Sequence, residues 1–198
     1  MRSPLTQFRS IILVLVSAFA LGACATDQAS EPAGGSQAAA FNEADIAFMQ
    51  SMIQHHSQAV EMAQLVGERA AHEELNQLAS TIIADQTREI DTMTGLLAAA
   101  GAPSSRGGMQ GMGHGGMEMP GMAGEPEVAA LRSLDGEPFD LRFLALMTAH
   151  HEGAIEMAEQ VLQDGENPQL ADLARGIVEA QRAEIQQMAA WREEWTTR

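Results

Sequence analysis

Residues 51–63 read SMIQHHSQAVEMA, and the chain repeats this design 95 residues later as LMTAHHEGAIEMA at 146–158. Each copy holds two adjacent histidines, with one methionine before the pair and another after it. When residues 45–93 and 140–188 are aligned without a gap, 18 of 49 positions are identical. An ungapped match of this length indicates that one structural unit is used twice.

Both copies carry the periodicity of helices. In the first copy, residues three or four apart form one stripe, and a second stripe follows a break near Gly67; the stripes are Phe48, Met52, His55, Ala59 and Met62, then Leu75, Leu78, Ile82, Gln86, Ile90, Met93 and Leu97. In the second copy, Asn167 and Pro168 form a helix start as N-cap and first helical residue. We predict helices at 43–66, 72–100, 139–163 and 168–196, and a short one at 127–134.

These helices pair into two hairpins, each with one apolar stripe. Two such hairpins can bury their stripes only against each other, which predicts an all-α fold, a four-helix bundle made of two repeated hairpins. The bundle domain would span residues 41–198 and contain a Met/Gly-rich loop at 101–126 between the repeats.

The amino-terminal segment has the pattern of an export signal. Arg2 and Arg9 precede the apolar run IILVLVSAFALGA, which is too short to span a membrane comfortably. The run ends directly before Cys24, the only cysteine of the chain, and this resembles a bacterial lipobox. We expect residues 1–23 to be a lipoprotein signal peptide, Cys24 to be lipidated and residues 24–40 to be a flexible tether. The alternative is an ordinary signal peptide with an incidental cysteine.

The chain is strongly acidic. Its formal net charge is −16, and it becomes −18 without residues 1–23, which hold two arginines and no acidic residue. This charge disfavours binding to nucleic acid, which needs clustered Lys and Arg, and it suits cations. With one cysteine, the chain has no internal disulfide, so its stability must come from a packed core.

The His-His pairs are the first candidate metal ligands. Adjacent residues on a helix point about 100° apart, so we expect one imidazole of each pair at a helix interface and its neighbour at the edge of the seam. Methionines on an apolar stripe usually serve as core fillers. Burying four polar rings, however, would require four separate partners. The candidate ligands are Met52, His55, His56 and Met62, and Met147, His150, His151 and Met157.

The residues around the histidines indicate which metal would bind. Helical bundles with di-iron or di-manganese centres present Glu-x-x-His, and no histidine of this chain has a glutamate three residues before it. Two of the histidines follow Met-x-x instead. Thioethers select Cu(I) and the similar Ag(I), whereas structural zinc favours thiolates.

The loop between the repeats carries more soft donors. They lie among glycines and fill no helical stripe; the candidates are Met109, Met112, His114, Met117, Met119 and Met122. We expect this loop to bind soft metal without contributing to the fold, and compositional drift in a linker is the alternative.

Several other residues recur in both copies or lie near helix ends. Candidate partners that orient the imidazoles are Asp45, Asp140, Gln86, Gln181, Glu89 and Glu184. For the glutamines and glutamates, hydrogen bonds that pair the helices are the alternative. His72 is expected to be solvated, because the second copy has Asn167 there. Trp191 and Trp195 are expected to cap one end of the bundle.

Together, these motifs resemble domain-of-unknown-function family 305 over residues 41–195. The resemblance rests on the two Met–His-His segments, on Asp-x-x-Phe before each of them, and on ADQTREIDTM and EAQRAEIQQM in the helices that follow. It implies a ferritin-like four-helix fold, usually exported, that binds copper or silver in some members. The second copy departs from the first at Leu144 and Thr148, which stand where the first has Met49 and Ile53.

The leading hypothesis is a non-enzymatic, lipid-anchored protein of the cell envelope that sequesters Cu(I) or hands it on. It would face the periplasm, at the outer membrane in a Gram-negative host, and its partner would be a copper exporter or another copper-handling protein. Two alternatives remain open: a ferritin-like metal-dependent redox enzyme, and a structural or partner-binding helical bundle.

Overall fold

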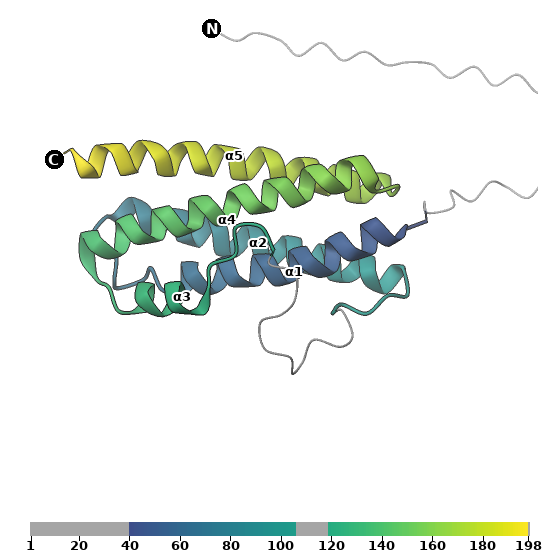
Figure 1. Cartoon of the computed structure of the whole chain (residues 1–198), viewed down its shortest axis with the longest axis horizontal. Coiled ribbons are helices and arrows are strands. Elements are labelled where there is room, and N and C mark those ends of the chain that lie inside the picture. The colour runs from purple at the N-terminus through teal and green to yellow at the C-terminus, as the bar shows by residue number, and fades with distance from the viewer. Residues whose placement is uncertain (1–39, 106–118, 198) are drawn as a thin grey trace, which may run out of the picture. The chain divides into compact units, whose positions relative to one another are not determined.

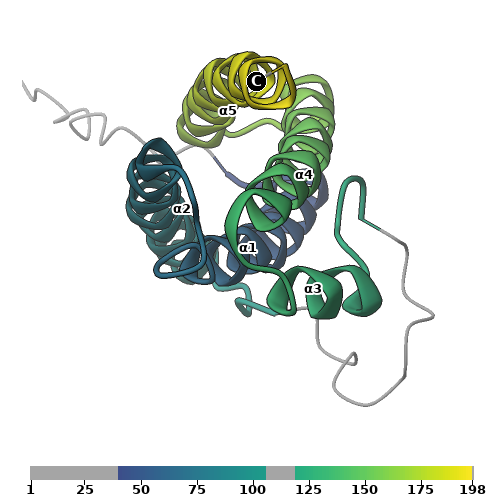
Figure 2. The ribbon, with the colours of Figure 1, turned by 90° about the vertical axis from the view of Figure 1, so that its left-hand side faces the viewer.

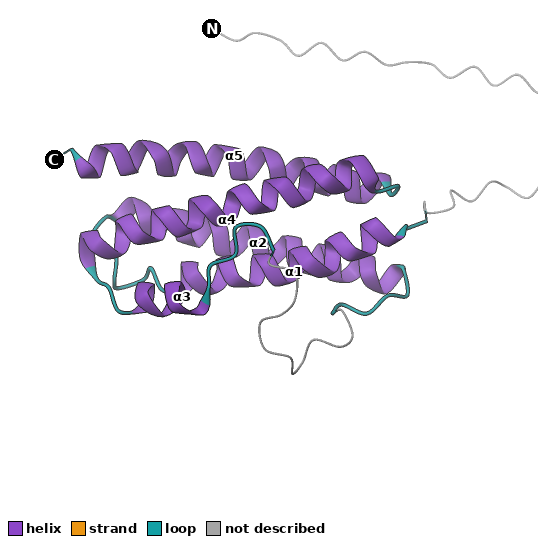
Figure 3. Ribbon diagram, in the orientation of Figure 1, coloured by secondary structure: helices purple, strands orange, loops and turns teal. Residues whose placement is uncertain are grey.

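The computed structural model describes residues 40–105 and 119–197 of the 198-residue chain. In these residues all regular secondary structure is helical (Figure 3), which confirms the predicted all-α class. α1 and α2 form the first hairpin, α4 and α5 form the second, and the short α3 precedes the second hairpin (Figure 1). The helices are α1 (Glu43–Gln64), α2 (Glu73–Ala99), α3 (Glu125–Arg132), α4 (Gly136–Asp164) and α5 (Pro168–Thr196).

Helix boundaries follow local signals in the sequence. The side chain of Asn167 caps α5, and Pro168 is the first residue of that helix, as predicted. α4 begins at Gly136 rather than at 139, because Pro138 fits in the first turn, where its missing N–H has no helical partner. α3 likewise begins two residues earlier than predicted, with Pro126 in its first turn. The other predicted boundaries lie within two residues of the observed ones.

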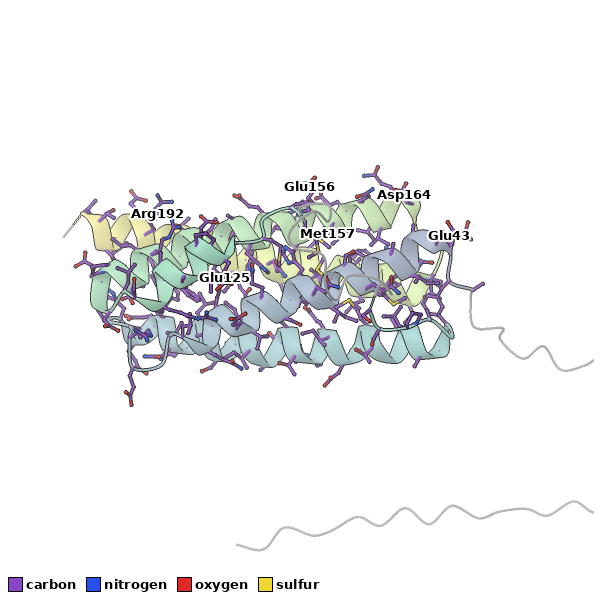
Figure 4. The ribbon with its side chains drawn as sticks, turned by 60° about the horizontal axis from the view of Figure 1, so that its bottom comes forward. Glu43, Glu125, Glu156, Met157, Asp164 and Arg192 are labelled. Carbon is purple, nitrogen blue, oxygen red and sulfur yellow. The ribbon has the colours of Figure 1, made fainter. Side chains whose placement is uncertain are left out.

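The four long helices surround one core. α1 packs along α2, α4 packs along α5, and α1 packs against α4. In the end-on view the four long helices occupy the corners of the bundle, and α3 lies outside them (Figure 2). Glu43 at the start of α1 and Asp164 at the end of α4 lie at the same end of the bundle, so α1 and α4 run antiparallel (Figure 4).

The core consists of two apolar clusters with a polar layer between them. The Trp195 cluster draws on the second half of α1, the first halves of α2 and α4, and the second half of α5; its members include Ala59, Met62, Leu75, Ile82, Phe139, Phe143, Met147, Met188 and Trp195. The Met52 cluster takes the other halves of the same helices; its members include Phe48, Met49, Met52, Met93, Leu97, Ala154, Ala158 and Ile177. Both His-His pairs lie between the clusters along α1 and α4.

Two equivalent aspartates tie the hairpins together, and we call these contacts the aspartate clasps. Asp45 of α1 is buried and accepts hydrogen bonds from the backbone N–H groups of Glu166 and Asn167, both at 3.2 Å, in the turn of the second hairpin. Asp140 of α4 is buried and accepts from the backbone N–H groups of Ala71 and His72, both at 3.1 Å, in the turn of the first hairpin. Each repeat therefore supplies the carboxylate that satisfies the turn of the other.

Candidate metal centre

The four paired histidines form one row across the centre of the bundle, which we call the histidine layer. His55 and His56 come from α1, His150 and His151 from α4, and all four are fully buried. The ring centroids of His55 and His150 lie 3.8 Å apart, whereas the two rings within each pair are 6.4 Å apart. The predicted seam-edge imidazoles, His56 and His151, are thus not at an exposed edge, because α2 and α5 cover them.

Each outer imidazole of the layer meets a glutamate from the other helix of its hairpin. His56 Nε2 lies 2.8 Å from Glu89 Oε2 on α2, a close contact that is poorly aligned as a hydrogen bond. His151 Nε2 donates to Glu184 Oε2 on α5 at 2.6 Å. The glutamate side chains are 15% and 17% exposed, so each carboxylate links the buried row to the edge of the bundle. A carboxylate in this position fixes the orientation and tautomer of an imidazole and strengthens it as a metal ligand.

A tight turn from the loop between the repeats closes on His55. Residues 119–122 form a type II turn, closed by a 3.3 Å hydrogen bond between its end residues, with Pro120 followed by Gly121 at φ +73°. His55 Nε2 donates to the Pro120 carbonyl oxygen at 2.9 Å. Gly153 of α4 permits this close approach, because a Cβ there would overlap the same carbonyl. This part of the loop packs on the bundle, contrary to the expectation that the loop contributes nothing to the fold.

Several ring nitrogens of the layer have no hydrogen-bond partner among the residues that the structure describes. His55, His56 and His151 use Nε2 for the contacts described above, and their Nδ1 atoms are buried without a hydrogen bond among the described residues. In His150 neither ring nitrogen has a well-formed one. Leaving a buried polar atom unpaired costs about 1–3 kcal/mol. A neutral imidazole that donates through Nε2 carries its lone pair on Nδ1, so the layer presents lone pairs inside the core.

The two central imidazoles stay neutral at physiological pH. Burial away from water lowers the pKa of His55 to about 4, although the hydrogen bond to Pro120 offsets part of the effect. Burial, together with repulsion from neighbouring imidazoles, lowers the pKa of His150 to about 2, and a looser contact with the backbone of His55 offsets only a little. A neutral imidazole need not lose a proton before it binds a metal ion.

The predicted methionine ligands are distributed on both sides of the layer. Met52 belongs to one apolar cluster and Met62 to the other, so they do not flank one site together. Met147 shares the Trp195 cluster with Met62. Met157, labelled in Figure 4, is partly buried and packs against the Met52 cluster. Each side of the histidine layer therefore holds one predicted methionine ligand from each repeat. This arrangement differs from a metal site built from the histidines and methionines of a single repeat.

Sequence reasoning missed two thioethers. Met93 of α2 and Met188 of α5 are fully buried, and Thr148 Oγ1 donates to Met188 Sδ at 3.9 Å. Gln86 and Gln181, predicted as partners of the imidazoles, are each 3% exposed, and their amide atoms have no hydrogen bond among the described residues. The sequence carried one signal for these residues. Met93 and Met188 occupy equivalent positions of the repeat, and so do Gln86 and Gln181.

Two other sequence predictions need correction. Asp45 and Asp140 form the aspartate clasps instead of orienting the paired histidines, because ten residues of helix, about 15 Å, separate each from its pair. His72 is mostly covered, with its side chain 22% exposed: Nδ1 donates to Asp140 Oδ2 at 2.6 Å, and the ring stacks on Trp195 with centroids 3.8 Å apart. Trp195 stacks in turn on Trp191, which places both indoles together.

Other predicted features lie partly or wholly beyond the described residues. Outside them are residues 1–23, Cys24, the tether as far as residue 39, and the loop candidates Met109, Met112, His114 and Met117. Met119 and Met122 are partly buried at the two ends of the type II turn.

Within residues 40–105 and 119–197, no three His, Cys, Asp or Glu side chains are arranged to hold one metal ion. Over the same residues, no helix has both the length and the apolar character needed to cross a bilayer. The donors in and beside the histidine layer are imidazole nitrogen, thioether sulfur, amide oxygen and the carboxylate oxygens of Glu89 and Glu184. Of these, thioether sulfur suits soft metal ions, and imidazole binds copper in either oxidation state.

The fold and the layer define a class of helical-hairpin proteins in which buried imidazoles and thioethers share one core. Residues 45–192 match the family described as Domain of unknown function (DUF305), and the chain belongs to that family. The chain matches no curated protein.

Solved structures of other family members are similar to this chain. A DUF305 protein from Streptomyces coelicolor, described as secreted, is 38% identical; the match covers 77% of this chain and 92% of that one, with a TM-score of 0.69. A DUF305 fragment from Deinococcus radiodurans is 33% identical, over 78% and 99% of the two chains, with a TM-score of 0.70. CopM in its Cu(I)-bound form is 32% identical, over 76% and 96%, with a TM-score of 0.62. CopM has also been solved with Cu(II) and with Ag.

Proposed function

We propose that this protein binds Cu(I) and Ag(I) through the histidine layer and the methionines beside it, and that it sequesters copper or hands it on in the cell envelope. One observation carries the proposal: four fully buried imidazoles form a single row, and each keeps at least one ring nitrogen without a hydrogen bond to any residue that the structure describes. A purely structural core would gain stability by replacing such rings with apolar side chains.

The chemistry of the donors favours a soft, monovalent ion. Thioethers bind Cu(I) and Ag(I) well and hard divalent ions poorly, and imidazole binds copper in either oxidation state. Burial keeps His55 and His150 neutral, so their lone pairs are available at pH 7. Glu89 and Glu184 would hold the outer imidazoles in orientation while a metal binds. Methionines of the 101–126 loop are proposed as further thioether ligands.

The proposed setting is the periplasmic face of the cell envelope. Its support is the signal-like segment at 1–23, the lone Cys24 at its end, the relative described as secreted, and the copper- and silver-bound CopM structures. A copper exporter or another copper-handling protein would take the metal from the site. The formal charge of −18 after removal of residues 1–23 suits a cation cargo.

The test is anaerobic Cu(I) titration in competition with a chromophoric chelator. Glutamine is close to histidine in size and carries no imidazole, so the variants are His55→Gln with His56→Gln, and His150→Gln with His151→Gln. Each double variant should bind less Cu(I) than the wild type and should gain less thermal stability when Cu(I) is added.

His72→Gln serves as the matched control, because His72 lies at the end of the bundle and outside the layer. Its Cu(I) binding should equal that of the wild type. If the double variants gain the same thermal stability from Cu(I) as the wild type does, the histidines are core residues and the proposal fails.

A further inference from the structure

We infer that Met93 and Met188, together with Gln181 and Gln86, complete two equivalent soft-metal sites, one on each side of the histidine layer. Each site draws donors from both hairpins. This inference rests on the proposed function, and it names the ligands that the repeat motif alone does not reveal.

The first step is the register within each hairpin. His56 of α1 contacts Glu89 of α2, and the two helices run antiparallel. Both helices rise about 1.5 Å per residue. The residue four before His56 on α1 and the residue four after Glu89 on α2 therefore lie at the same level along the bundle axis. Met52 and Met93 are therefore level with each other, and both belong to the Met52 cluster.

The second hairpin gives the same pairing. His151 of α4 contacts Glu184 of α5, and the same count places Met147 level with Met188. The hydrogen bond from Thr148 Oγ1 to Met188 Sδ, at 3.9 Å, locates that sulfur beside this part of α4. Both methionines are fully buried in the Trp195 cluster.

The third step crosses between the hairpins. His55 and His150 are in contact on antiparallel helices, so Ala154 of α4 lies within one residue of the level of Met52. On α5, Gln181 precedes Glu184 by three residues, and the hairpin register places it level with Ala154. One layer thus contains two thioethers from the first hairpin and one amide from the second.

The repeat generates the mirror arrangement on the other side of the histidines. The same counts place Ala59 and Gln86 of the first hairpin level with the methionine pair of the second. In both layers the fourth position is a fully buried alanine, Ala154 or Ala59, which carries no donor atom in its short side chain.

The glutamines are the second observation that points to a ligand. Gln86 and Gln181 are almost completely buried, and both amide atoms of each have no hydrogen bond among the described residues. In copper sites built from imidazole and thiolate, a glutamine oxygen can replace methionine as the weak axial ligand. Each site would therefore combine two thioethers, one imidazole Nδ1 and one amide oxygen.

Core filling is the competing explanation for the methionines, and the chain supplies its own contrast. Met49 is also fully buried in the Met52 cluster, but the second repeat has Leu144 in the equivalent place. Leucine can therefore fill this position of the repeat. By contrast, the repeat keeps methionine at 52 and 147 and at 93 and 188, and glutamine at 86 and 181.

The experiment compares Met93→Leu and Met188→Leu with the matched control Met49→Leu, since leucine has nearly the volume of methionine and carries no sulfur. All chains also carry Met109→Leu, Met112→Leu, His114→Leu, Met117→Leu, Met119→Leu and Met122→Leu, so that none of the loop candidates obscures the result. Each test variant should lose roughly tenfold or more in Cu(I) affinity at one of two sites, and the double variant at both. The control should bind like its parent.

X-ray absorption of the Cu(I)-loaded parent should show two sulfur neighbours per copper, and the double variant should show fewer. Gln181→Leu and Gln86→Leu should each weaken one site, and unchanged affinity would overturn the assignment of the amides. If the parent binds Cu(I) but Met93→Leu and Met188→Leu match it, this inference is overturned while the proposed function stands. If the wild-type chain binds no Cu(I), the proposed function itself is wrong.

Discussion

Acid should destabilise the metal-free protein through the two central histidines. In the folded chain His55 and His150 have pKa values of about 4 and about 2, whereas an unfolded histidine has a pKa of about 6.5. As the pH falls below about 6.5, the unfolded chain therefore binds two protons that the folded chain does not bind. The two histidines therefore leave the free energy of unfolding unchanged above about pH 6.5, and they lower it as the pH falls below that value.

The magnitude follows from the size of the pKa shifts. A group that is protonated only in the unfolded chain removes about 1.4 kcal/mol of stability per pH unit. Between pH 6.5 and 5 the loss is about 2 kcal/mol for each histidine, or about 4 kcal/mol for both. That is a large part of the 5–15 kcal/mol by which domains are typically stable. The contribution of His55 levels off near pH 4, and that of His150 continues below it.

The assay is urea unfolding of the metal-free protein at pH 7, 6 and 5. Wild type, His55→Gln, His150→Gln and the double variant are compared, so that contributions from all other titrating groups cancel. Below pH 6 the slope of unfolding free energy against pH should be shallower by about 1.4 kcal/mol per unit in each single variant, and by about twice that in the double variant. If all four chains show the same slope, the central histidines are not held neutral by burial and the reasoning is refuted.

Two further predictions concern the anchor and the turn. Replacing Cys24→Ser should move the protein from the membrane fraction to the soluble envelope fraction, and a variant that still sediments with membranes would contradict lipid anchoring. Gly153→Ala should lower stability by roughly 1–3 kcal/mol in thermal unfolding, because its Cβ would overlap the Pro120 carbonyl oxygen. The control is Gly176→Ala on helix α5, where an added Cβ would meet nothing within 4 Å, and this variant should be neutral or stabilising. If both variants lose the same stability, the close approach at Gly153 is not the cause.

Sequence reasoning succeeded where the information is local. The gapless repeat and the 3.6-residue periodicity predicted the two hairpins, and the cap at Asn167 predicted the start of α5. Repetition also brought Glu89 and Glu184 to attention, and the structure places both against imidazoles. Such signals depend on neighbours along one helix, and these are visible in the sequence.

The errors arose where the answer depends on how the hairpins meet. Periodicity gives the side of a helix on which a residue lies, but it does not give the level of that residue relative to another helix. Asp45 shares a face with the paired histidines, yet the register of α1 against α4 places it beside Glu166. The Pro120 carbonyl is a backbone group in a loop, so no side chain pattern could have marked it as the partner of His55. Met93 and Met188 were overlooked because buried methionine usually signals packing alone.

The aspartate clasps carry a consequence for the ancestry and modularity of this fold. Each repeat contains one carboxylate and one turn that receives a carboxylate: the first has Asp45 and the turn at 71–72, and the second has Asp140 and the turn at 166–167. A peptide of a single repeat would thus possess both halves of the contact, and two such peptides could satisfy each other around a twofold axis. The covalent link between the repeats is then a device for raising the effective concentration of one half against the other. The single chain can be regarded as a fused homodimer. Because the covalent link keeps the two copies together, their sequences were free to diverge.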